Sequence, residues 1–203
     1  MPQPPEQQTI LAKRRLRDEM KRRLSSTPPS SEAGQRMASH LTASPVWQAH
    51  RALAGFMPFG GEPDVLPLLQ LWLQCRKALL LPVFDRESRA YALAQVFALD
   101  SGWLATQHFG IREPLPHLPR LKPPFADDFP DVWLVPGLAF SPQGERLGRG
   151  CGYYDRLLHQ SRAVRIGVAY DCQIVESLPI APHDIPMDYL LTESAFHSCR
   201  QVA

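Results

Sequence analysis

The fold of this chain is constrained most by short apolar runs that alternate with segments of helical periodicity. Ala78 to Phe84 is continuously apolar, as expected of a strand buried on both faces of a sheet. Further strands are predicted at Ala52 to Phe59, Tyr91 to Leu99, Asp131 to Phe140, Arg165 to Tyr170 and Met187 to Leu191. Helical spacing covers Val65 to Arg76 and Gly152 to Gln160. This alternation predicts the α/β class, with three α/β/α layers around a mostly parallel central sheet.

The N-terminal part of the chain predicts a helical arm. Glu6 to Leu24 contains good helix formers and neither glycine nor proline. After a break rich in serine and proline, a second helix is expected at Glu32 to Thr42, capped by Ser30 or Ser31. We therefore expect a single domain over residues 1–203 that includes a helical arm over residues 1–45.

Charge and cysteine content narrow the class of protein. A net charge of +2 in 203 residues gives no reason to expect nucleic acid or an acidic membrane as a partner. The apolar runs are too short to cross a bilayer, and no secretory signal peptide is expected. The four cysteines lie too far apart for a CxxC motif and are expected to be reduced thiols. These features predict a cytoplasmic protein, which we expect to be a monomer.

A proline-rich segment spans residues 114–130. It holds six of the chain's 21 prolines, so it can form neither a helix nor an inner strand. Its length suggests a lid or binding loop, but a plain surface linker is an equally good interpretation.

The most informative local motif runs from Gly144 to Asp155, between an apolar strand and a helix. Glycines alternate there with arginines, at Arg146, Gly148, Arg149, Gly150 and Gly152. Glycine lets backbone N–H groups approach an anion, and arginine offers a bidentate fork to phosphate oxygens. The motif matches neither a Walker A loop nor a dinucleotide fingerprint. A polyphosphate cradle is favoured over a tight structural turn.

Two aspartates are candidate Mg²⁺ ligands. Asp155 lies in the first turn of the predicted helix, where a carboxylate could also simply complement the helix dipole. Asp184 lies between prolines in a loop, where it could equally be a turn residue. Magnesium bound to a nucleotide usually takes one or two carboxylates together with phosphate oxygens.

The segment from Val135 to Leu158, VPGLAFSPQGERLGRGCGYYDRLL, closely resembles the signature of the 5-formyltetrahydrofolate cyclo-ligase family, also called methenyltetrahydrofolate synthetase. Four shorter segments support the resemblance in the right order: KRRLR from Lys13, FMPFGGEPD from Phe56, GIREP from Gly110, and the tail from Gly167 to Asp188. The likeness spans nearly the whole chain. It implies an ATP-dependent cyclisation of 5-formyltetrahydrofolate to 5,10-methenyltetrahydrofolate, with release of ADP and phosphate.

The resemblance also implies roles for individual residues. ATP would be bound by Lys13, Arg17, Arg146, Leu147, Gly148, Arg149, Gly150, Cys151, Gly152, Tyr153 and Tyr154. The reduced folate would contact Met57, Glu62, Arg149, Gly150, Cys151, Gly152 and Tyr153. Mg²⁺ would be held by Asp155 and Asp184, and Arg149 and Tyr153 would act in catalysis. Many relatives carry lysine or glycine in place of Cys151, so no role is expected for its side chain.

Three alternative interpretations remain at this stage. A sugar-phosphate isomerase-like enzyme would need an anion loop but no ATP. A non-catalytic relative could bind folate without turning it over. Lys13 and Arg17, one helical turn apart, could be no more than a solvated basic face.

Overall fold

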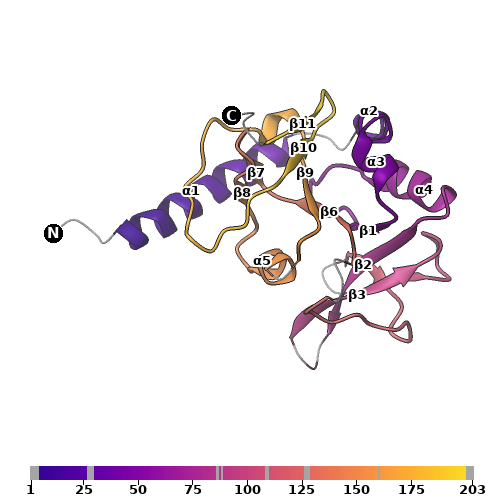
Figure 1. Ribbon diagram of the computed structural model, residues 1–203. Helices are drawn as coiled ribbons and strands as arrows, with labels where there is room; N and C mark the ends of the chain where they lie inside the picture. The colour runs from indigo at the N-terminus through magenta and orange to yellow at the C-terminus, as the bar shows by residue number, and fades with distance from the viewer. Residues whose placement is uncertain are drawn as a thin grey trace.

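The computed structural model describes residues 5–26, 30–85, 87, 89–107, 110–125, 129–159 and 161–199. Its centre is a seven-stranded sheet with strand order β11-β10-β9-β6-β1-β2-β3 (Figure 1). These strands are β1 (Ala52–Ala54), β2 (Ala78–Asp85), β3 (Ala90–Val96), β6 (Val132–Pro136), β9 (Val164–Val168), β10 (Tyr189–Leu191) and β11 (Phe196–Ser198). The edge pairs β2–β3 and β10–β11 are antiparallel, and every pair between them is parallel. The predicted mostly parallel sheet is confirmed.

Alternate residues of the inner strands enter two separate apolar layers. Leu53 and Leu134 belong to the first layer, whereas their neighbours Ala54, Trp133 and Val135 belong to the second. All five are fully buried. The central strands are therefore buried on both faces, which explains why they read as continuous apolar runs rather than alternating ones.

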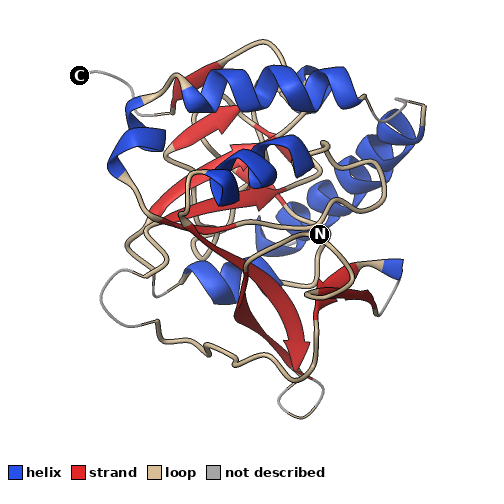
Figure 2. Ribbon diagram, turned by 90° about the vertical axis from the view of Figure 1, so that its right-hand side faces the viewer, coloured by secondary structure: helices blue, strands red, loops and turns tan. Residues whose placement is uncertain are grey.

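Helices cover both faces of the sheet. The first layer is closed by α2 (Ser31–Thr42), α3 (Pro45–Ala49), α4 (Leu66–Gln74) and the C-terminal half of α1 (Pro5–Ser25), which lie in front of the sheet or to its right in Figure 2. The opposite layer is closed by α5 (Tyr153–Leu158) through Leu157 and Leu158. The predicted cap is also confirmed, since the Ser30 hydroxyl accepts a 3.2 Å hydrogen bond from the Ala33 N–H group.

Two predicted strands are shorter than expected. The run from Ala52 to Phe59 forms a strand only as far as Ala54, because the following segment contains prolines and glycines and turns away from the sheet. The run from Asp131 to Phe140 divides into β6 and the two-residue strand β7 (Ala139–Phe140). Gly137 lies at the break, where a Cβ atom would be 2.7 Å from the Phe140 ring. A side chain there would block this return of the chain.

Two small hairpins were not predicted. One pairs β4 (Leu104–Thr106) with β5 (Arg112–Pro114) and packs against β2. The other pairs β7 with β8 (Arg146–Leu147), and a single 3-10 turn, η2, follows at Asp171–Gln173. These strands are two or three residues long, too short for a period-two pattern to be recognised.

Among its described residues, the proline-rich segment forms no helix and no named strand after Pro114. Leu121 exchanges backbone hydrogen bonds of 2.8 and 2.7 Å with Leu93 of β3, so this stretch lies along the edge of the sheet. In the part of the chain that the structure describes, no helix is both long and apolar enough to cross a membrane.

Candidate active site

A pocket of about 1180 Å³ opens between α1, the loop after β1, the β8–α5 segment, β5 and the loop before β10. Every residue to which the family resemblance assigns a role lies on its wall. These residues are Lys13, Arg17, Met57, Glu62, the continuous segment from Arg146 to Asp155, and Asp184. Residues separated by more than 170 positions in the sequence are thus brought to one cavity by the fold.

The glycines of the β8–α5 segment provide space and an unusual backbone. Gly150 and Gly152 have φ values of +102° and +64°, in the region that favours glycine over other residues. Gly152 is also the N-cap of α5. A Cβ atom on Gly148 would lie 2.8 Å from the Arg146 guanidinium. The alternating glycines therefore let the chain turn tightly and leave room for an arginine beneath it.

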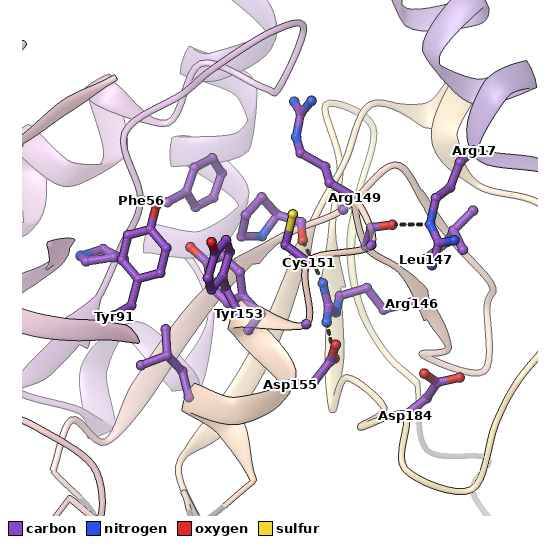
Figure 3. Close-up of a pocket in the computed structure, with 18 of the residues that line it drawn as sticks. Arg17, Phe56, Tyr91, Arg146, Leu147, Arg149, Cys151, Tyr153, Asp155 and Asp184 are labelled. Atoms are coloured by element: carbon purple, nitrogen blue, oxygen red, sulfur yellow. Dashed lines mark hydrogen bonds and ion pairs between the residues drawn. The ribbon is translucent and has the colours of Figure 1, made fainter. Parts of the chain in front are cut away.

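Arg146 is a buried cation on the pocket wall, with only 5% of its side chain exposed. It forms an ion pair with Asp155 and donates a 3.4 Å hydrogen bond to the Pro136 carbonyl (Figure 3). Its Nε–H group has no partner among the described residues. A buried cation with an unsatisfied donor is suited to an anionic ligand.

Arg149 makes different contacts. Its guanidinium points away from Arg146 and Asp155 in Figure 3 and bonds to the loop after β1. It donates hydrogen bonds to Glu62 Oε1 at 3.1 Å and to the carbonyls of Phe59 and Gly60 at 2.8 and 3.2 Å. Arg149 therefore joins the glycine-rich segment to the loop that carries Glu62.

Glu62 is a buried carboxylate held from two sides. Its Oε2 atom accepts a 3.1 Å hydrogen bond from the Phe59 N–H group, and Oε1 accepts the bond from Arg149. Burial raises the pKa of Glu62 above its ordinary value, and the charge of Arg149 offsets part of this rise. Both oxygens are oriented, so the carboxylate is a fixed acceptor on the pocket wall.

The cations of α1 face the pocket rather than solvent. Lys13 Nζ lies 2.5 Å from Asp184 Oδ2, and Arg17 Nε donates a 2.9 Å hydrogen bond to the Gly148 carbonyl. Burial alone would raise the pKa of Asp184, but Lys13 and the Ala181 N–H group together hold it below its ordinary value. The interpretation of Lys13 and Arg17 as a solvated basic face is therefore wrong.

The opposite end of the pocket is aromatic. The Tyr153 ring meets the ring edges of Tyr91 and Phe84 at centroid distances of 4.8 and 6.2 Å. Burial raises the pKa of Tyr91 to about 12 and also raises the pKa of Tyr154. Both phenols therefore stay protonated at neutral pH and can donate hydrogen bonds.

Sequence reasoning missed one wall of the pocket. Among the residues on this wall are Pro82, Tyr91, Ile111, Arg112 and Glu113. Glu113 is 4% exposed, and its Oε2 accepts a 3.2 Å hydrogen bond from the Phe84 N–H group. The GIREP segment was the available signal, but short strands from distant parts of the sequence gave no indication of a shared surface. The described part of the proline-rich segment beyond Pro114 does not line the pocket, which favours a surface connection over a lid.

The fold and the pocket define an α/β protein with one deep cavity wall rich in cations and another that is apolar and aromatic. The sequence profile of the 5-formyltetrahydrofolate cyclo-ligase family matches residues 9–193. The chain belongs to this family.

Relatives agree over most of their length. The chain is 34% identical to 5-formyltetrahydrofolate cyclo-ligase of Mycolicibacterium smegmatis, covering 89% of this chain and 93% of the relative. It is 37% identical to the enzyme of the same name from Escherichia coli K12, covering 85% and 95%. The solution structure of Aquifex aeolicus 5,10-methenyltetrahydrofolate synthetase superposes with a TM-score of 0.79 at 33% identity, covering 94% of each chain.

Proposed function

We propose that this pocket binds Mg²⁺-ATP and 5-formyltetrahydrofolate together, at the residues that the family resemblance assigned. The enzyme is a 5-formyltetrahydrofolate cyclo-ligase, which converts 5-formyltetrahydrofolate to 5,10-methenyltetrahydrofolate with ATP as co-substrate. The observation that carries the assignment of the site is the convergence of all the assigned residues on one pocket.

The phosphates of ATP fit the cationic end. Lys13, Arg17 and Arg146 face the pocket there, and the glycine-rich backbone lies between them. The unsatisfied Nε–H group of Arg146 is a donor available to a phosphate oxygen. Charge-assisted bonds of this kind hold the nucleotide and neutralise the charge that moves with the transferred phosphoryl group.

The residues near Lys13 and Arg146 also fit a magnesium ion. Asp155 and Asp184 line the same pocket, and no group of three metal-ligating side chains exists among the described residues. Two carboxylates without a third protein ligand suit Mg²⁺, because this ion completes its shell with phosphate oxygens and water. When bound, the ion would neutralise phosphate charge. Lys13 and Arg146, which now pair with these carboxylates, would then be released toward the phosphates.

The pterin fits the other end, where Met57, Glu62 and Tyr153 line the wall. A carboxylate fixed by Arg149 and the Phe59 N–H group retains lone pairs for the N–H groups of a pterin edge. The rings around Tyr153 supply a flat apolar surface. Arg149, which bonds to Glu62 from within the glycine-rich segment, lies between the two ligand ends.

The chemistry requires positioning more than acid-base catalysis. The formyl oxygen attacks the γ-phosphorus of ATP, ADP leaves, and the formyl carbon becomes an iminium phosphate. N10 of the same folate then attacks that carbon and loses its proton, the C–O bond breaks, and inorganic phosphate departs with both electrons of that bond. Because the second step is intramolecular, holding the folate and the γ-phosphate in line accounts for much of the rate. Arg149 and Tyr153 are proposed to orient the reacting groups.

The direct test is an absorbance assay with purified protein, 5-formyltetrahydrofolate and Mg²⁺-ATP. The methenyl product should form only when all three components are present, together with one ADP per turnover. A sugar-phosphate isomerase-like enzyme would ignore ATP, and a non-catalytic folate-binding relative would bind the folate without forming product. Either result would contradict the proposed site.

We also propose that the enzyme acts as a monomer in the cytoplasm, independently of nucleic acid or membranes. All four cysteines are free thiols, which suits a reducing compartment. Size-exclusion chromatography with light scattering tests the oligomeric state, and fractionation of cells that produce the protein tests its location.

A further inference from the structure

Two large apolar side chains are exposed at the mouth of the pocket. Ile10 of α1 is 59% exposed, and Ile180, in the loop before β10, is 57% exposed. Both line the pocket. Since water contact with apolar surface is unfavourable, exposed apolar side chains that share a cavity mouth commonly contact a ligand.

The two isoleucines are held at the same end of the pocket by the contact between their segments. The Lys13–Asp184 ion pair joins α1 to the loop that carries Ile180, and Figure 1 shows this loop crossing the helix. Ile10 lies three residues before Lys13, which places both on one side of the helix with a rise of about 4.5 Å between them. Arg17 lies a further turn along the same face. Moving outward along α1, the pocket therefore changes from cationic to apolar.

This order matches the chemical order of a nucleoside triphosphate, with charged phosphates at one end and a flat apolar base at the other. We propose that Ile10 and Ile180 form the nucleobase subsite and hold the base of ATP between them. This inference rests on the proposed function, because it takes Lys13 and Arg17 as phosphate ligands. The base would cover the two isoleucines and so remove apolar surface from water.

The same surroundings predict loose discrimination between bases. The other residues lining this end are Thr9, Ala181, Pro182 and His183, and the His183 side chain is 79% exposed. A wall of small and apolar groups recognises a flat surface, whereas strict selection requires buried polar groups that match the edge of the base. Other purine nucleoside triphosphates should therefore bind with affinities close to that of ATP.

The test compares ATP with inorganic tripolyphosphate, each with Mg²⁺, by isothermal titration calorimetry. Ile10→Ser and Ile180→Ser should each raise the Kd of ATP by about tenfold, from the apolar contact that is lost. The Kd of tripolyphosphate should not change, because the phosphate ligands are intact. Leu11→Ser is the matched control: Leu11 is the next residue of the same helix, is 40% exposed, and does not line the pocket.

Three results would overturn the proposal. The first is wild-type ATP affinity in both isoleucine variants. The second is an equal loss of affinity for ATP and tripolyphosphate, which would mean that the substitutions disturb the phosphate ligands. The third is a Leu11→Ser variant that loses as much ATP affinity as Ile10→Ser. If the wild-type protein binds tripolyphosphate and ATP equally well, the base subsite is absent although the phosphate site exists. If it binds neither, the proposed function itself fails.

Discussion

Replacing Arg149 by alanine should destabilise the protein in a way that depends on pH. The substitution removes one hydrogen bond to a buried carboxylate, on Glu62, and two to carbonyls, on Phe59 and Gly60. The Arg149 side chain is 36% exposed, so each bond is taken near the lower end of its usual range. The sum is roughly 2 kcal/mol at neutral pH. For a chain of this length, that loss corresponds to a fall in Tm of about 4–8 °C.

The pH dependence follows from Glu62. Its pKa in the folded protein is raised above the ordinary value of 4.5, chiefly by burial, so its ionised form is less favourable in the folded state. This group's contribution therefore favours folding most at low pH and declines as pH rises from 4.5 through the raised value. Removing Arg149 raises the folded pKa further and enlarges the decline. The difference in stability between Arg149→Ala and wild type should accordingly be smaller near pH 4.5 than at pH 7.5.

Urea unfolding at both pH values, followed by circular dichroism, measures this difference. The same pair of proteins in a Glu62→Gln background provides the control, because a neutral amide has no charge for Arg149 to compensate. There the effect of Arg149→Ala should no longer vary with pH. An effect of equal size at both pH values in the original background would refute the argument that Arg149 stabilises a buried carboxylate.

Three further predictions concern the phosphate end. Asp155→Asn and Asp184→Asn should each raise the Mg²⁺ concentration needed for half-maximal turnover, as an activity titration would measure; unchanged Mg²⁺ dependence in both would exclude them as ligands. Replacing both Lys13 and Arg17 by alanine should weaken ATP binding by at least about tenfold in calorimetry, since each charge-assisted contact contributes about 1.5–3 kcal/mol. Gly150→Ala should cost about 1–2 kcal/mol of stability, because φ is +102° there, and should reduce turnover by more than the unfolded fraction explains. Equal losses of folded protein and turnover would make the glycine purely structural.

The sequence predicted those parts of the fold that depend on burial over several residues. Buried strands such as Ala78 to Asp85 and the helix that begins at Pro5 were recognised because their pattern extends over two turns or several strand positions. Strand ends were less well predicted: Gly55 still bonds to the sheet, but Pro58 lacks a backbone donor, and propensity alone did not locate the turn between them.

The site divides in the same manner. The segment around Gly148 is contiguous, so its composition and family resemblance were visible in one stretch of sequence. The contacts of Arg149 with Glu62 and of Lys13 with Asp184 join residues far apart in the chain, and no local pattern encodes them. The wall containing Tyr91 was missed for the same reason, since its residues come from separate strands.

The cations of this pocket already have partners within the protein. Lys13 is paired with Asp184, and Arg146 with Asp155, so a phosphate gains only the difference between its own attraction and that of the carboxylate it displaces. The same exchange operates in reverse after turnover. As ADP and inorganic phosphate loosen, the aspartates compete for the cations and favour dissociation of the products. The internal ion pairs thus moderate the affinity for the nucleotide and, by doing so, shorten the time for which spent nucleotide occupies the enzyme.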